Sequence, residues 1–434
     1  LTLLDGAILY APFHTIGLFS VFDTDYLRNV DVYSAGFQAD YGGRIGAVTD
    51  VTTRNGNFKR YSGKVELSTI SAGGMVEGPL FKKKGEEQGP ISFLVSARGS
   101  FLEQAARGLY SYAPNEVGES ESPLPFTFLD TYGKLTFGNK ANRGNVFFFH
   151  QRDQVRYGFP SDYSWKQSGG GANFQLLPSK SGMIITGTIA GSAFENTQQV
   201  PDERLPRKSR ISGFNTRLNF SYIFNGVDEL SYGLQLLGFG TDYRFINSVG
   251  LTAEQSTNNT EFVAYVRYRK VFRSKKRDEE TDQRLERFVL EPGLRLHYYN
   301  DQGYVSAEPR LTAKLNLPRM SFQAAAGLYT QNLISATSDR DVVVLFQGFL
   351  STPQTVGYQQ LDHGLQAASH LVFGTEVEIA KGLKTSIEGW LKDFRQITNI
   401  NRTRTQQNQP RFVAETGQAY GLDVVLNYRW QELY

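Results

Sequence analysis

The chain has 434 residues and a formal net charge of +3, and 13% of its residues are aromatic. Cysteine is absent, which excludes disulfides and thiolate metal sites, and the small net charge gives no reason to expect a nucleic-acid partner. No stretch approaches the roughly 18 uninterrupted apolar residues of a membrane-spanning helix, so a helical membrane protein is not expected.

Residues 1–60 are studded with glycine and carry short apolar runs without long alternation, so they are predicted to form a small mixed domain. Gly42 and Gly43 permit positive φ and close backbone approach in a tight turn. Arg44, which follows them, is a permanent cation with a forked set of donors.

Four motifs in this segment resemble, in their order, the plug of TonB-dependent outer-membrane receptors of the Bacteroidota type. They are Leu3 to Ile8, like an "LDG" strand and turn; His14 to Phe22; Asp31 to Arg44, similar to "vxxGxxxxxYGGR"; and Val48 to Gly56, similar to "vxxixTrxG". The chain departs from the SusC-like subgroup between Ala35 and Tyr41, so a surface lipoprotein partner stays open. The resemblance implies that residues 1–60, called the plug segment below, are the C-terminal part of a plug. Its motif residues are Asp5, Gly6, His14, Tyr41, Gly42, Gly43, Arg44 and Arg54.

The resemblance also implies how the plug segment is held. Members of this family pair plug arginines with barrel carboxylates, so Arg44 and Arg54 are candidates for that role; alternatively, Arg44 caps a local turn. Possible carboxylate partners on polar strand faces include Glu291, Glu308, Glu376 and Glu388, and the sequence does not choose between them. His14 is expected to be a structural hydrogen-bonding residue rather than a ligand.

Residues 61–434 show alternation of apolar and polar residues, which predicts β-strands with one face in lipid and one in water. Between Val305 and Leu317 the odd positions are apolar and the even positions are polar or ionic. Such runs last about 10 to 13 residues, whereas soluble strands usually have about 5 to 6 and tilted membrane strands need about 9 to 11. A soluble β-sandwich could share the composition but not the strand length.

Short and long connections mostly take turns along this region, as in outer-membrane barrels with brief periplasmic turns and extended outer loops. The predicted long loops are 102–129, 153–166, 194–212, 241–259, 330–369 and 396–413, and 273–287 is predicted to be an enlarged periplasmic turn. The sequence thus predicts an all-β transmembrane fold, an antiparallel up-and-down β-barrel with about 16 strands. Family relatives have about 22, so barrel strands and the start of the plug with its TonB box are expected outside residues 1–434; a complete 16-stranded barrel is the alternative.

No catalytic or metal-binding signature is present: the five histidines lack compact spacing, and there is no phosphate loop or nucleophile elbow. We expect no enzyme, no cofactor and no metal site. Four aromatic residues in or directly beside the two longest loops, Tyr110, Tyr112, Tyr329 and Phe346, are candidates for ligand contacts, or they pack the loops on themselves.

The function that the resemblance implies is energy-coupled import across the bacterial outer membrane. A siderophore, cobalamin, glycan or peptide would bind the outer loops, and TonB with its inner-membrane energising complex would remodel the plug. The rival is a receptor-like barrel that serves as an anchor or scaffold in a larger envelope assembly. A passive porin is a third interpretation, which the plug resemblance disfavours.

Overall fold

The computed structural model describes most of the chain, and nearly all of its regular structure is β-strand. The described residues are 1–14, 19–81, 91–101, 126–138, 141–156, 161–179, 181–199, 206–246, 250–277, 284–336, 346–357, 359–360, 363–380, 382–401 and 404–429. A short 3-10 helix, η2 (Thr24–Tyr26), interrupts the strands. No helix within these ranges is long and apolar enough to cross a membrane.

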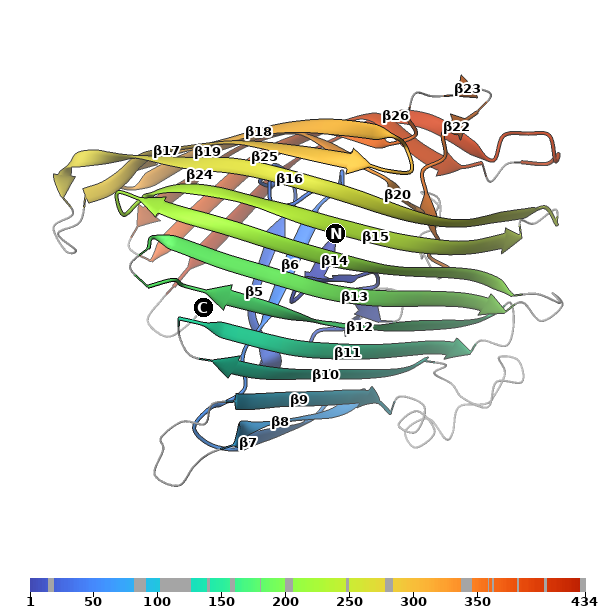
Figure 1. Cartoon of the computed structure of the whole chain (residues 1–434), viewed down its shortest axis with the longest axis horizontal. Helices are drawn as coiled ribbons and strands as arrows, with labels where there is room; N and C mark the ends of the chain where they lie inside the picture. The colour runs from blue at the N-terminus through green and yellow to red at the C-terminus, as the bar shows by residue number, and fades with distance from the viewer. Residues whose placement is uncertain are drawn as a thin grey trace.

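Sixteen strands form one sheet, called the large sheet, in which every neighbouring pair is antiparallel (Figure 1). They are β7 (Ser62–Leu67), β8 (Ser71–Phe81), β9 (Ile91–Ser100), β10 (Phe126–Gly138), β11 (Arg143–Arg156), β12 (Asp162–Leu176), β13 (Met183–Gln199), β14 (Arg207–Phe224), β15 (Asp228–Ile246), β16 (Thr252–Arg277), β17 (Arg284–Tyr299), β18 (Tyr304–Leu317), β19 (Met320–Gln331), β24 (Gln366–Ala380), β25 (Leu383–Ile400) and β26 (Phe412–Tyr428). The predicted count of about 16 antiparallel strands is confirmed. Strands β7 and β26 are the two edges, and among the described residues they are not paired with each other.

Several strands are longer than the sequence predicts. Strand β15 has 19 residues and β16 has 26, and together they occupy most of the predicted loop 241–259. Strands β13 and β14 likewise take up most of 194–212, and β16 and β17 enter the predicted turn 273–287. Beyond the membrane both faces of a strand lie in water, so ladder pairing continues there without the apolar alternation that marks a strand in the sequence.

The burial pattern of the large sheet is the reverse of that in a soluble protein. On β18, the side chains of Val305 and Leu311 are 56% and 47% exposed, whereas that of Glu308 is fully buried. The alternation predicted between Val305 and Leu317 is therefore confirmed, with the apolar face outward and the ionic face inward. An outward apolar face is stable only against lipid.

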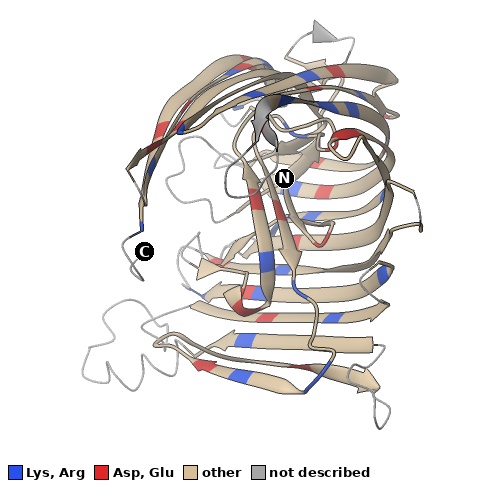
Figure 2. Cartoon of the chain, turned by 90° about the vertical axis from the view of Figure 1, so that its left-hand side faces the viewer, with Lys and Arg blue, Asp and Glu red and all other residues tan. Residues whose placement is uncertain are grey.

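The large sheet curves into a C shape, and the plug segment lies on its inner side (Figure 2). The plug segment has a four-stranded sheet with the order β2 (Ala7–Leu9), β1 (Thr2–Leu4), β6 (Val48–Thr53) and β5 (Leu27–Tyr33). Strands β1 and β6 are parallel, and the other two pairs are antiparallel. A small hairpin, β3 (Phe13–His14) and β4 (Phe19–Ser20), completes it.

The Asp5-Gly6 pair forms the two-residue turn between β1 and β2. Both residues have positive φ, 49° for Asp5 and 92° for Gly6, as a type I′ hairpin requires, and Asp-Gly is a favoured pair for that turn. A β-carbon on Gly6 would lie 2.6 Å from Cγ2 of Thr188 on β13. The turn therefore faces the large sheet at close range.

Between β19 and β24 the chain turns inward instead of closing a simple hairpin. Residues 332–336 and 346–356, called the strap below, include β20 (Leu333–Ser335), β21 (Phe349–Ser351) and β22 (Thr355–Val356). Strands β20 and β21 pair with each other, and β22 pairs with β23 (Gln359–Gln360). Most of this connection was predicted to be an outer loop.

Candidate functional site

The plug motif residues lie along the interface between the plug segment and the large sheet. The first contact is made by the buried carboxylate of Asp5. It accepts hydrogen bonds from the backbone N–H of Thr53 at 3.0 Å, the hydroxyl of Thr53 at 2.6 Å and the hydroxyl of Tyr132 at 2.6 Å, and Nζ of Lys134 lies 3.5 Å away. Because Tyr132 and Lys134 belong to β10, Asp5 ties its own turn to both the plug segment and the large sheet.

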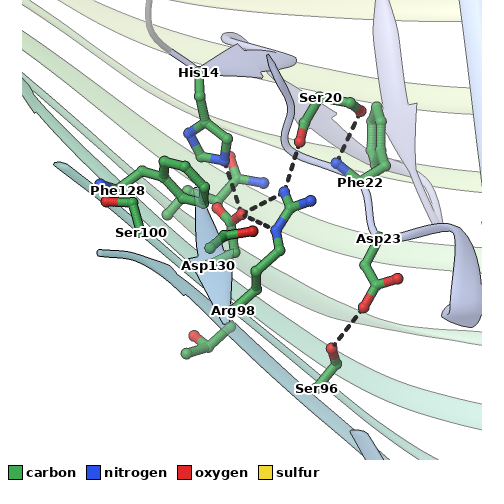
Figure 3. Close-up of polar contacts among 12 residues, drawn as sticks. His14, Ser20, Phe22, Asp23, Ser96, Arg98, Ser100, Phe128 and Asp130 are labelled. Carbon is green, nitrogen blue, oxygen red and sulfur yellow. Dashed lines mark hydrogen bonds and ion pairs between the residues drawn. The ribbon is translucent and has the colours of Figure 1, made fainter. Parts of the chain in front are cut away.

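His14 makes the second contact, from β3 (Figure 3). Its fully buried ring lies between two carboxylates, with Nδ1 2.6 Å from Asp153 on β11 and Nε2 2.8 Å from Asp130 on β10. The ring also stacks on Phe128 at a centroid distance of 4.5 Å. Both ring nitrogens face acceptors, so the geometry suits the doubly protonated imidazolium.

The electrostatics of His14 agree with that protonation state. Burial alone would lower its pKa, but the hydrogen bonds and negative charges of Asp130 and Asp153 outweigh burial and raise the pKa from 6.5 to about 9. Arg98 on β9 joins the same cluster, because its Nη2 donates to Asp130 at 2.8 Å and to the backbone carbonyl of Ser20 at 2.6 Å. The hairpin β3–β4 is thus held by charge-assisted hydrogen bonds from three strands of the large sheet.

The third contact is the loop that contains the Tyr41-Gly42-Gly43-Arg44 motif. Arg310 on β18 donates from Nη1 to three backbone carbonyls of this loop, those of Phe37, Gln38 and Tyr41. Its Nη2 donates to Glu308 at 2.6 Å, which neutralises the charge. The hydroxyl of Tyr329 on β19 donates to the carbonyl of Phe37 at 2.9 Å.

A second arginine, Arg295 on β17, enters the same loop and is fully buried. It donates to the carbonyls of Ala39 at 3.2 Å and Asp40 at 3.4 Å, and to Gln235 at 2.9 Å. A β-carbon on Gly42 would lie 2.3 Å from Nε of Arg295, and Gly43 has φ 70°. Glycine is therefore required at position 42 by close approach and at position 43 by conformation.

The two plug arginines behave differently. Nη1 of Arg54 lies 2.5 Å from Glu77 on β8, and its Nε donates to the carbonyl of Asp25 at 2.7 Å, so Arg54 joins the plug segment to the large sheet. Arg44 donates to the carbonyl of Gly43 at 2.7 Å, within its own loop. This geometry matches the alternative in which Arg44 caps a local turn.

None of the four expected carboxylates forms an ion pair with Arg44 or Arg54 in the described part of the chain. Glu291 pairs with Arg267, Glu308 with Arg310 and Glu376 with Lys384, while Glu388 accepts from Gln323. None of these four candidates is therefore the partner of Arg54, which pairs instead with Glu77, a residue that the sequence motifs do not single out. Glu291, Glu308 and Glu376 pair with cations on their own or an adjacent strand, and Glu388 bonds to Gln323 two strands away.

The tip of the same loop is fastened by three further residues of the large sheet. Nε2 of His370 on β24 lies 2.9 Å from the carbonyl of Ile45, and Lys392 on β25 donates to the carbonyl of Gly46 at 3.0 Å. Gln331 on β19 accepts from the N–H of Ile45 at 3.1 Å. The large sheet therefore holds this loop of the plug segment mainly through hydrogen bonds to its backbone.

The candidate ligand-contact residues are dispersed. Tyr110 and Tyr112 lie outside the described residues. Tyr329 is 1% exposed, stacked on His370 and bonded to the plug segment, so it faces the interface and not an outer surface. Phe346 packs against Tyr243 and Phe245 of β15.

Among the described residues, one acidic group has ligand atoms close enough together for a metal ion: Asp23, Asp25 and Glu66. Lys64 already lies 2.6 Å from Asp25, and an exposed acidic group is common without an ion. The interface is suited to holding and releasing a polypeptide segment, and none of its described contacts forms a nucleophile–base pair with an oxyanion hole.

Neither a scan against protein-family models nor a search of curated proteins finds a match for the sequence. The structure, however, is similar to solved outer-membrane receptors. The siderophore receptor PirA from Pseudomonas aeruginosa aligns with a TM-score of 0.64 and 12% identity over 98% of this chain and 73% of that one. PirA from Acinetobacter baumannii gives 0.65 and 11% over 100% and 70%, and the outer membrane transporter YddB from Escherichia coli gives 0.60 and 11% over 98% and 66%.

These likenesses establish the fold. The chain has the fold of TonB-dependent outer-membrane receptors, with a plug segment enclosed by antiparallel strands of a transmembrane β-barrel. That agrees with the fold expected from the sequence motifs and from the alternation.

Proposed function

We propose that the protein is a bacterial outer-membrane receptor that imports a scarce or large ligand through a plugged β-barrel. In this proposal residues 1–60 are the C-terminal part of the plug and residues 61–434 are barrel strands. TonB, with its inner-membrane energising complex, displaces the plug segment to open a path. The protein is a carrier and not an enzyme, and it needs no cofactor.

The observation that carries the proposal is the chemistry of the interface. The outward face of the large sheet is apolar, while its inward face meets the plug segment with arginines, carboxylates and the histidine His370. A typical hydrogen bond contributes only about 0.5–1.5 kcal/mol net, because water can replace it. Many such bonds hold the plug segment firmly, yet they exchange for water one at a time when the segment is pulled.

The ligand class is proposed from the neighbours. Two of the similar structures are siderophore receptors, which supports an iron chelate as the first ligand to test. Cobalamin, a glycan and a peptide are the next, because receptors for these ligands share the architecture. A surface lipoprotein partner is part of the proposal only for the glycan case.

Deletion of the gene tests the function. The deletion strain is grown with limiting iron supplied on siderophores, and with limiting cobalamin, glycan or peptide. We expect slow growth on one of these and rescue by the wild-type gene but not in a strain that lacks TonB. Normal growth on all four would favour the scaffold instead.

A further inference from the structure

The path of the strap is longer than its connection requires. Strands β19 and β24, which it joins, are neighbours in the large sheet, yet β21 contacts β14, β15 and β16. Strand β14 is five places from β19 in the sheet order, which is roughly 24 Å along the sheet at about 4.8 Å per strand. On its return, β22 contacts β26. The strap therefore crosses the inner side of the large sheet.

Hydrogen bonds fasten the strap to the wall that it reaches. The N–H of Phe349 donates to Oγ of Ser209 on β14 at 3.0 Å. Gln255 on β16 bonds both backbone groups of Ser351, accepting from its N–H at 2.9 Å and donating to its carbonyl at 3.1 Å. These neutral bonds fix the position of β21 without burying charge.

The strap is also fastened to the plug segment, through Tyr10. The ring of Tyr10 lies edge-on to Phe349 at a centroid distance of 5.5 Å, and both rings contact Phe194 on β13. All three rings are buried, and Leu333 of the strap packs in the same cluster. The N–H groups of Tyr10 and Ala11 donate to Gln167 on β12 at 2.6 and 3.1 Å, so Tyr10 is held in place from the wall side.

A second link runs through one amide. The side chain of Gln331 accepts from the N–H of Ile45 in the plug segment and donates to the carbonyl of Leu333 in the strap. Because Gln331 belongs to β19, displacing the plug segment would remove the aromatic anchor of the strap and would leave the Gln331–Leu333 bond without the Ile45 partner that helps to orient the amide.

We propose that the strap is a lid whose closed position depends on the plug segment, with Tyr10 as the coupling residue. While the plug is seated, Tyr10 completes the apolar cluster that holds Phe349 against β13 and β14. When the plug is displaced, Phe349 keeps Phe194 but loses Tyr10, one of its two ring partners, and the strap is loosened from the inner side of the sheet. Seating of the plug and closure of the lumen are then one event. The purpose of the lid rests on the proposed function, but the coupling itself does not.

Coupling of this kind is reciprocal, because a free energy shared by two segments must act on both. Removing the ring of Tyr10 from the plug segment must loosen the strap. Removing the ring of Phe349 from the strap must loosen the plug segment by the same factor. A role confined to local packing would instead affect only the segment that carries the substitution.

Amide hydrogen exchange of the full-length receptor in detergent micelles tests the coupling without ligand or TonB. In Tyr10→Ala, we expect about three- to tenfold faster exchange in β20 and at Phe349 and Ser351, because a buried aromatic pair is worth roughly two- to twelvefold beyond the area that it buries. In Phe349→Ala, we expect a similar increase at the N–H groups of Tyr10 and Ala11. Tyr10→Phe, which keeps the ring, should stay within about twofold of the wild type.

The proposal is overturned if strap exchange in Tyr10→Ala stays within about twofold of the wild type while β1 remains protected. Should Tyr10→Ala unfold the plug segment, Phe349→Ala decides, since Phe349 lies outside that segment: unchanged exchange at Tyr10 and Ala11 overturns the coupling. Ser209→Ala, which weakens the strap without touching the rings, should loosen the strap less than Tyr10→Ala does. A receptor without a nutrient phenotype would overturn the proposed function and leave these results unaffected.

Discussion

Arg295 occupies the space that a side chain at Gly42 would need. A β-carbon on Gly42 would lie 2.3 Å from Nε and 2.8 Å from Cδ of Arg295, a fully buried residue of β17 that donates to the neighbouring plug carbonyls. Because Gly42 has no side chain, the guanidinium of Arg295 can reach the backbone of the plug loop.

Gly42→Ala is expected to push this loop away from Arg295. Overpacking of a buried contact costs about 1–3 kcal/mol, so exchange of the amides between positions 36 and 46 should rise at least fivefold in the purified receptor. Gly46→Ala is the matched control, because a β-carbon on Gly46 meets nothing within 4 Å. Equal exchange in the two variants would show that the close approach does not hold the loop.

Arg310→Met is expected to be strongly destabilising, because it leaves the carboxylate of Glu308 buried without its partner. Breaking a buried pair in this way costs about 3–5 kcal/mol. In the double variant Arg310→Met/Glu308→Gln, thermal stability should largely recover, while the plug loop stays loosened because its three carbonyl contacts are gone. Recovery of normal loop exchange in the double variant would contradict the role assigned to Arg310.

His14 is expected to make plug attachment depend on pH. Its pKa is raised from 6.5 to about 9 in the folded protein, so its stabilising contribution is complete below pH 6.5 and is lost as the pH rises through 9. The shift corresponds to a contribution on the order of 3 kcal/mol. The β3–β4 hairpin should exchange faster as the pH rises from 7 to 10, after correction for intrinsic exchange rates.

The control for this pH dependence is His14→Gln, which keeps hydrogen-bonding capacity but has no titratable ring. Its hairpin should exchange quickly at pH 7 and change little by pH 10. If wild type and variant showed the same pH profile, another group would be responsible.

Leu311→Arg tests whether the outward face meets lipid. Leu311 lies in the middle of β18 and Leu317 ends it, both facing outward. Arginine on the lipid face costs about 2–4 kcal/mol at the bilayer midplane and about 0–1 near the interface. In urea unfolding from lipid vesicles, the free energy of unfolding should therefore fall strongly in Leu311→Arg and only slightly in Leu317→Arg. Similar decreases in the two variants would argue against the predicted membrane position.

The sequence predicts the fold better than it predicts the interface. Alternation between Val305 and Leu317 reports a strand directly, because each side chain faces one of two solvents. The alternation pattern does not predict the strands in 241–259, because β15 and β16 continue there into water and need no apolar face. Strand ends outside the membrane leave no periodic signal.

The interface was harder to predict for a different reason. The motif resemblance points to plug side chains paired with carboxylates of the barrel, whereas Arg295 and Arg310 bind backbone carbonyls, which every residue has and no motif marks. Both arginines stand on polar strand faces in the sequence, yet nothing there separates them from solvated charges. The glycines at 42 and 43 were the visible sign of close approach, but the partner that approaches lies some 250 positions away.

The most direct test of the account is to tether the plug segment to the large sheet. A β-carbon on Gly293 of β17 would lie 3.0 Å from that of Ala39 in the plug loop, and a small loop shift reaches the roughly 3.5–4.5 Å of a disulfide. The sequence has no cysteine, so Ala39→Cys/Gly293→Cys forms a single defined bond. We predict that cells carrying this variant fail to grow on the nutrient identified by the deletion strain and recover when dithiothreitol reduces the bond. Undiminished growth with the disulfide intact would contradict import by displacement of the plug.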